Sequence, residues 1–235
     1  MEKQAIREHV WDELATRKIA RFPFPPHNRI PNFAGAADAA DRLATTDSWQ
    51  EARVVKINPD SPQRAVRGNA LRANKTLYMA VPRLRDERCF LRIDPTIVDD
   101  VDEATTIGGS TKHGEPVRPE AVEPVDLVVV GSVAVDRHGA RIGKGEGYSD
   151  LEFAMLREYG IVDDSTPTAT TVHDVQVMDE PLPTDELDVP LDVVATPTER
   201  IAQPELTAKP DGLDWTRISV EQRTSIPMLA RLAPD

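Results

Sequence analysis

Apolar and polar positions in the first part of the chain predict a helix followed by a proline-rich segment. Ile6, Val10 and Leu14 recur at spacing four, which is typical of the buried face of a helix, so we expect a helix over residues 3–19. Residues 22–33 are rich in proline and aromatic side chains. They cannot continue the helix because proline lacks a backbone N–H and clashes with the preceding turn.

Further along, short apolar runs alternate with helical patterns. The run over residues 126–131 is almost continuously apolar, which is typical of a parallel strand covered on both faces. Strands are expected over residues 52–57, 76–81, 126–131, 168–172 and 191–196, and helices over residues 35–47, 62–73 and 151–159. This alternation predicts an α/β fold with a mostly parallel sheet.

Two regions interrupt or follow this pattern. Residues 99–122 are acidic, glycine-rich and without periodicity, so we expect a local insertion or mobile loop there. Residues 202–235 contain polar residues and proline, then scattered apolar side chains, and are expected to pack on the body as a short helical appendage. The chain is therefore predicted to hold one α/β domain over residues 1–201 and a C-terminal appendage.

Composition narrows the class of partner. The 235 residues carry 28 basic and 40 acidic side chains, a formal net charge of −12, which argues against binding nucleic acid phosphates. No apolar run approaches the roughly 20 residues that span a bilayer, and the charged start is not typical of a signal peptide. The single cysteine, Cys89, excludes an intramolecular disulfide framework. We expect a cytoplasmic protein with a small-molecule partner, no nucleic acid and no membrane.

The charged residues are unevenly chosen, with 21 Arg against 7 Lys and 23 Asp against 17 Glu. An acidic, lysine-poor surface suits a halophilic cytoplasm, where salt screens self-repulsion within a few Å. Compositional drift in a GC-rich genome is the alternative explanation. Neither bears on activity.

The segment Arg-Ile-Gly-Lys-Gly-Glu-Gly-Tyr-Ser-Asp over residues 141–150 is the most informative stretch. Gly143, Gly145 and Gly147 let backbone N–H groups approach a ligand closely, and the following helix adds positive potential at its start. Arg141 and Lys144 add charge suited to phosphate. The segment therefore predicts a phosphate-binding loop, with a flexible turn between strand and helix as the alternative.

Other candidates flank this loop. Asp150 could hold magnesium or simply favour the helix start. Lys3 and Arg7 are spaced by four and continue the face of Val10 and Leu14, so they are expected to point toward the body, although a solvated basic turn is the alternative. We expect Lys3, Arg7, Arg141 and Lys144 to converge on one anion-sized position.

Taken together, these motifs resemble the 5-formyltetrahydrofolate cyclo-ligase (methenyltetrahydrofolate synthetase) family, in a divergent branch. The resemblance rests on the Lys-x-x-x-Arg start, the strand–turn–helix after Val54, the Arg-x-Gly-x-Gly-x-Gly-Tyr-x-Asp loop and the block over residues 172–196. It covers roughly residues 3–201. It implies a three-layer α/β/α sandwich of the NagB/RpiA/CoA transferase type.

The same resemblance implies an ATP- and Mg²⁺-dependent ring closure of 5-formyltetrahydrofolate to 5,10-methenyltetrahydrofolate, by a monomer or homodimer. Phosphorylation of the formyl oxygen would turn it into a leaving group. The implied catalytic residues are Arg141, Lys144 and Tyr148; the implied ATP-binding residues are Lys3, Arg7, Gly143, Gly145, Gly147 and Tyr148; the implied metal ligands are Asp150 and Asp192.

The sequence departs from the family pattern at two loop positions, which keeps other functions open. Ser149 and Leu151 stand where the family usually has a second tyrosine and a basic residue, and Asp60 is the nearest candidate for the acid expected near the folate. The main alternative is a noncatalytic nucleotide- or folate-binding homologue, which could be linked to thiamine metabolism. A sugar-phosphate isomerase or CoA transferase would have only Glu146 as a candidate base or nucleophile.

Overall fold

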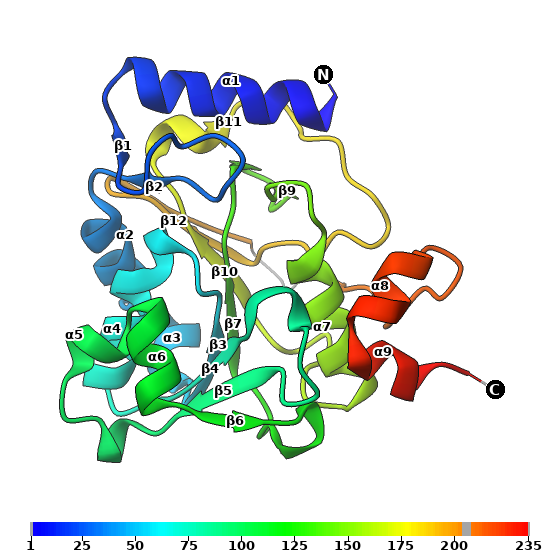
Figure 1. Cartoon of the computed structure of the whole chain (residues 1–235). Coiled ribbons are helices and arrows are strands. Elements are labelled where there is room, and N and C mark those ends of the chain that lie inside the picture. The colour runs from blue at the N-terminus through cyan, green and yellow to red at the C-terminus, as the bar shows by residue number, and fades with distance from the viewer. Residues whose placement is uncertain (1, 204–207, 235) are drawn as a thin grey trace.

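A mixed sheet of eight strands forms the middle layer of the protein in the computed structural model, which describes residues 2–203 and 208–234 (Figure 1). The strands lie in the order β13-β12-β10-β7-β3-β4-β5-β6. They span Val54–Ile57 (β3), Thr76–Ala80 (β4), Phe90–Ile93 (β5), Glu115–Val117 (β6), Leu127–Val130 (β7), Thr168–Thr171 (β10), Val193–Ala195 (β12) and Arg200–Ala202 (β13). The five expected strands coincide with β3, β4, β7, β10 and β12, so the predicted α/β fold is confirmed.

The sheet has a parallel centre and antiparallel edges. Strands β12, β10, β7, β3 and β4 pair in parallel, whereas β13, β5 and β6 run antiparallel to their neighbours. From β3 the chain first moves outward to β4 and later returns to β7 on the opposite side of β3. Ligands of open α/β sheets bind at such a reversal, beyond the carboxyl ends of the strands.

Helices cover both faces of the sheet and give three layers (Figure 1). Strand β7 shows the reason, because all of its side chains are buried and alternate between two cores. Leu127 and Val129 join the core under α2, α3 and α4, whereas Val128 and Val130 join the core under α7 and α9. The first face carries α2 (Ala36–Leu43), α3 (Asp47–Glu51), α4 (Arg64–Arg72), α5 (Val101–Ala104) and α6 (Ile107–His113); the second carries α7 (Tyr148–Glu158), α8 (Val220–Ser225) and α9 (Pro227–Leu232).

The N-terminal helix α1 (Lys3–Thr16) packs on a smaller sheet of order β11-β8-β9. The predicted face of α1 is buried, with Ile6, Val10 and Leu14 against Ala134 and Ile142. The small sheet comprises β8 (Ala134–Asp136), β9 (Arg141–Ile142) and β11 (Val177–Met178), and a two-stranded pair, β1 (Ala20–Arg21) and β2 (Asn32–Phe33), brackets the proline-rich segment. Short 3₁₀ helices span Ser61–Gln63, Pro82–Leu84, Pro95–Ile97, Pro119–Ala121 and Asp174–Gln176.

The expectation of an unpatterned loop over residues 99–122 is wrong. This region contains α5 and α6, and β6 extends the main sheet by pairing with β5. Its helices are too short to show periodicity, and each begins with a polar cap: Asp100 accepts a hydrogen bond from the Glu103 N–H, and Thr106 accepts one from the Gly109 N–H. The helices predicted over residues 3–19 and 35–47 end earlier than expected, at Thr16 and Leu43.

The tail beyond residue 201 contains α8 and α9 among its described residues. Ile226, Met228 and Leu229 are buried in the same core as α7. The division of the chain at residue 201 stays a prediction. No helix among the described residues has the length and apolar character that crossing a membrane requires.

Candidate functional site

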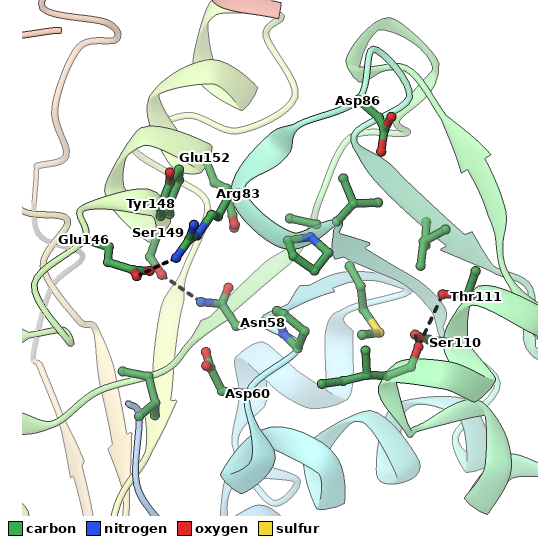
Figure 2. Close-up of a pocket in the computed structure, with 18 of the residues that line it drawn as sticks. Asn58, Asp60, Arg83, Asp86, Ser110, Thr111, Glu146, Tyr148, Ser149 and Glu152 are labelled. Atoms are coloured by element: carbon green, nitrogen blue, oxygen red, sulfur yellow. Dashed lines mark hydrogen bonds and ion pairs between the residues drawn. The ribbon is translucent and has the colours of Figure 1, made fainter. Parts of the chain in front are cut away.

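A large pocket of about 1010 Å³ opens beyond the carboxyl ends of β3 and β4, on the side where the glycine-rich segment enters α7. The segments that follow β3 and β4 form one wall, with Asn58, Asp60 and Arg83 (Figure 2). The glycine-rich segment and the start of α7 form another wall, and Ile107, Ser110 and Thr111 of α6 close the far side. The region that was expected to be a loop therefore helps to shape the site.

The segment after β3 is held by a buried arginine of α4. Arg67 is 2% exposed, and its Nη1 donates to the carbonyls of Asn58 at 2.6 Å and Asp60 at 3.0 Å. Its Nε and Nη2 donate to the Thr105 carbonyl at 3.2 and 2.9 Å. Burial lowers the pKa of Arg67 to about 10, so it stays charged near neutrality. Arg67 therefore fixes the Asn58–Asp60 turn against the α5–α6 region.

Asp60 projects toward the same pocket because Gly131, after β7, leaves room for it. A Cβ on Gly131 would lie 2.7 Å from Asp60 Oδ2, so any side chain there would displace the carboxylate. Burial raises the pKa of the Asp60 carboxyl, while Lys144, Arg67 and Lys56 oppose the rise. Asp60 therefore adds a partly desolvated carboxyl to the pocket, and its role as the acid near the folate stays a prediction.

A buried ion pair joins β3 to α7 beneath the pocket. Lys56 Nζ contacts Glu152 Oε2, and these residues are only 1% and 6% exposed. The same Nζ donates to Asn58 Oδ1 at 2.5 Å, and Asn58 Nδ2 donates to Ser149 Oγ at 2.7 Å. Burial raises the pKa of the Glu152 carboxyl, and the Lys56 ammonium opposes the rise. A continuous polar chain therefore runs from Glu152 to the surface of the pocket.

The glycine-rich segment lies against α1 through Arg7. Arg7 Nε donates to the Gly143 carbonyl at 2.7 Å, and burial lowers the pKa of this guanidinium while Asp188 opposes the decrease. Gly145 has a φ of 105°, and a Cβ there would lie 3.3 Å from Arg7 Cζ. Gly145 is required both for its left-handed backbone and for close packing on Arg7. Arg7 therefore supports the shape of the loop.

The cations of the loop itself are paired with acids. Arg141 is 5% exposed; its Nη2 contacts Asp150 Oδ1 and its Nη1 donates to the Gly131 carbonyl at 3.2 Å. The Asp150 Oδ1 atom also accepts a hydrogen bond from Val189 N–H at 3.1 Å. Lys144 Nζ lies 2.7 Å from Glu146. Arg141 therefore braces the loop, whereas Lys144 lies in the pocket wall.

Glu146 and Tyr148 complete the rim on this side. Glu146 also lies 3.6 Å from Arg83, which brings a second cation to the pocket from the segment after β4 (Figure 2). Tyr148 is the first residue of α7, half-buried, and it lines both the large pocket and the small one beside the loop. Its ring is therefore available to a ligand in the pocket.

Lys3 opens onto a second pocket of about 290 Å³ on the other side of the loop. Its Nζ lies 2.5 Å from Asp188 Oδ2. The C-terminal tail closes this pocket with Leu213 and with Arg217, whose guanidinium binds both carboxylate oxygens of Asp185 at 2.6 and 2.7 Å. Of the four cations expected to converge, Arg141 and Lys144 belong to the glycine-rich segment and Arg7 contacts it. Lys3 instead faces the second pocket.

Asp192 does not join Asp150. It directly precedes β12, and its Oδ2 accepts from Thr168 N–H at 2.8 Å and contacts Lys209 Nζ at 2.9 Å. Because β10 and β12 are parallel, their starts lie at the edge opposite the glycine segment. The expectation that both aspartates share a metal is therefore wrong. Within residues 2–203 and 208–234, no group of three or more His, Cys, Asp or Glu side chains could hold a metal ion.

Several pocket residues were not identified from the sequence. Lys56, Asn58, Arg83 and Glu152 lie in or beneath the wall. The available signal was Lys56, a lysine inside the otherwise apolar strand Val54–Ile57, since a buried lysine requires a partner. The partner itself, Glu152, is 96 positions away and could not be inferred locally.

Comparison with known proteins supports a folate-related family. A model of the 5-formyltetrahydrofolate cyclo-ligase family matches residues 1–197. The chain is 44% identical over 234 residues to the mouse methenyltetrahydrofolate synthase domain-containing protein, covering 98% of this chain and 63% of the relative. It is 33% identical over 75 residues to the Escherichia coli 5-formyltetrahydrofolate cyclo-ligase, which covers 32% of this chain and 38% of that enzyme.

The fold has a solved counterpart in the Aquifex aeolicus 5,10-methenyltetrahydrofolate synthetase. That structure aligns with a TM-score of 0.55 at 20% identity, covering 92% of this chain and 98% of the other. The chain spans about three fifths of the length of the mouse relative. The match over residues 1–197 nevertheless covers most of the chain, and the chain belongs to the 5-formyltetrahydrofolate cyclo-ligase family.

Proposed function

We propose that this protein closes the ring of 5-formyltetrahydrofolate to give 5,10-methenyltetrahydrofolate, at the expense of ATP. The observation that carries the proposal is the glycine-rich segment lying between Arg7 and a pocket of about 1010 Å³ beyond the carboxyl ends of β3 and β4. A loop with close backbone access suits the phosphates of ATP, and the pocket has room for a reduced folate.

The chemistry needs positioning and charge stabilisation more than a dedicated nucleophile. The formyl oxygen leaves poorly as water. Transfer of the γ-phosphoryl group to that oxygen, attack by N10 on the formyl carbon and departure of phosphate complete the ring. Lys144 and Arg83, which both pair with Glu146, are placed to stabilise the transferred charge at the pocket wall.

Asp150 is the proposed ligand of Mg²⁺. Its Oδ1 atom contacts Arg141 Nη2 and the Val189 N–H, and one carboxylate together with nucleotide phosphates is a common way to hold this ion. When bound, Mg²⁺ would neutralise phosphate charge. Arg141 holds the Asp150 carboxylate in place, and Tyr148 borders the space between nucleotide and folate.

A noncatalytic nucleotide- or folate-binding protein is the second candidate. Its support is the internal pairing of the cations, with Arg141 on Asp150, Lys144 on Glu146 and Lys3 on Asp188. A ligand phosphate must compete with these carboxylates, which are already in place. Such competition lowers affinity and could leave binding without turnover.

The deciding experiment follows the absorbance of the methenyl product after mixing the protein with 5-formyltetrahydrofolate, ATP and Mg²⁺ in concentrated KCl. Product formation that Lys144→Gln reduces at least tenfold, and Lys18→Gln leaves unchanged, supports the ligase. Lys18 is an exposed lysine outside the pocket and serves as the matched control. No product, with ATP binding detected by calorimetry, contradicts the ligase and favours the binding protein.

A further inference from the structure

Lys56 fixes which way the Asn58 side chain points. An ammonium group can only donate hydrogen bonds, so the Asn58 atom 2.5 Å from Lys56 Nζ must be the amide oxygen. Rotating the amide by half a turn would place its NH₂ group against the ammonium. Because Lys56 is 1% exposed and is itself held by Glu152, it has no room to move aside. The amide nitrogen of Asn58 therefore faces Ser149.

The direction of the next hydrogen bond follows. Asn58 Nδ2 lies 2.7 Å from Ser149 Oγ, and an amide nitrogen donates but does not accept. The Ser149 oxygen is therefore the acceptor, and its own proton must point elsewhere. Ser149 is half-buried and lines both the large pocket and the small pocket beside the glycine segment (Figure 2). Its hydroxyl proton can therefore be donated into the ligand space.

We propose that Ser149 is a hydrogen-bond donor of fixed direction to an acceptor oxygen of the ligand in the large pocket. Lys56, Asn58 and Glu152 are positioning residues that set this direction. The inference rests on the proposed function for the identity of the ligand, a reduced folate with carbonyl oxygens. A ligand that presented an N–H group to Ser149 would leave two donors facing each other, so the pocket selects for an acceptor at this position.

This role differs from a local helix-capping contact. A serine near the start of a helix often bonds to its own backbone. Here the partner is a side chain 91 positions away, which is itself oriented by a buried charge pair. A purely structural contact would affect stability and leave ligand affinity unchanged.

A double-mutant cycle tests the direction of the bond. The affinity for 5-formyltetrahydrofolate is measured by calorimetry without ATP for the wild type, Ser149→Ala, Asn58→Asp and the double variant. Asn58→Asp keeps an acceptor for Lys56 but replaces the donor, so the Ser149 hydroxyl must turn and donate to the new carboxylate. General repulsion by that carboxylate occurs in both Asn58→Asp proteins and cancels in the cycle.

We expect Ser149→Ala to weaken binding about tenfold in the wild-type background, the effect of one lost hydrogen bond, and to have no effect in the Asn58→Asp background. Ser149→Thr retains the hydroxyl and should restore most of the affinity. Ser225→Ala, which removes an exposed hydroxyl in α8 away from both pockets, should bind like the wild type. Circular dichroism confirms that each variant is folded.

Equal losses from Ser149→Ala in the two backgrounds, or no loss in the wild-type background, would overturn the inference and leave the proposed function standing. A wild-type protein that binds ATP but no reduced folate would instead overturn the proposed ligand, and the inference with it. The wild-type titration therefore separates the two failures.

Discussion

Lys56 and Glu152 lie 96 positions apart in the chain and form an ion pair that is almost completely shielded from water. Lys56 belongs to strand β3 and Glu152 to helix α7, so the pair ties the central sheet to the helix that follows the glycine-rich segment. Removing one partner of such a pair leaves an uncompensated buried charge. The Lys56–Glu152 ion pair therefore contributes both to the stability of the fold and to the shape of the pocket.

Lys56→Met tests this link. We expect it to lower the free energy of unfolding by about 3–5 kcal/mol, because the Glu152 carboxylate loses its buried partner. Chemical denaturation measures the change. Lys112→Met removes a lysine whose ion pair with Glu103 is exposed, and its denaturation midpoint should stay near that of the wild type. Equal effects of the two substitutions would show that the buried pair contributes no more to the free energy of unfolding than the exposed pair.

Gly145→Ala should disturb the loop without unfolding the protein. The φ of 105° strains any residue with a Cβ, and the added carbon would lie 3.3 Å from Arg7 Cζ. We expect about 1–3 kcal/mol of destabilisation and at least a tenfold loss of ATP affinity, measured by calorimetry. Gly108→Ala is the matched control, because a Cβ at Gly108 meets no atom within 4 Å. Unchanged ATP affinity in Gly145→Ala would contradict the assignment of the loop.

Asp150→Asn and Asp192→Asn should have different effects, because Asp150 is the proposed Mg²⁺ ligand and Asp192 has a structural role. Asp192 pairs with Lys209 in a fully buried contact, so its substitution should cost about 3 kcal/mol of stability and leave the Mg²⁺ dependence of ATP binding intact. Asp150→Asn should abolish that dependence. The measurements are urea denaturation and ATP titration over a range of Mg²⁺ concentrations. If Asp192→Asn also lost the Mg²⁺ dependence of ATP binding, Asp192 would have to be a metal ligand, and the prediction would be wrong.

The contact between the tail and the body should weaken in acid. Arg217 lowers the pKa of the Asp185 carboxyl from 3.8 to about 2 through two hydrogen bonds. Because the pKa is lower in the folded state, the contact contributes fully above pH 4 or so and is lost as the pH falls toward 2. Trp215, in the same tail, reports the change by fluorescence. In Arg217→Gln the ion pair is absent, so the fluorescence step between pH 4 and 2 should disappear, and a step like that of the wild type would contradict the contact.

Much of the fold was predictable because its signals are local. The apolar run around Val128 identified a buried strand, and the spacing of Ile6, Val10 and Leu14 identified the buried face of α1. The glycine-rich segment was recognisable because its alternating glycines and its adjoining helix are consecutive in sequence. Residues 99–122 were mistaken for a loop because α5 and α6 are short and owe their stability to caps and to the neighbouring sheet.

The sequence by itself determined the alternation of strands and helices, the family and the position of the glycine-rich segment. Only the tertiary structure decided that Asp192 lies at the opposite edge from Asp150, that Lys3 faces a second pocket and that Lys56 meets Glu152. The physical reason is that strand order and direction bring together side chains from distant segments. Local periodicity reports which face of an element is buried, but it carries no information about the neighbour against which that face packs.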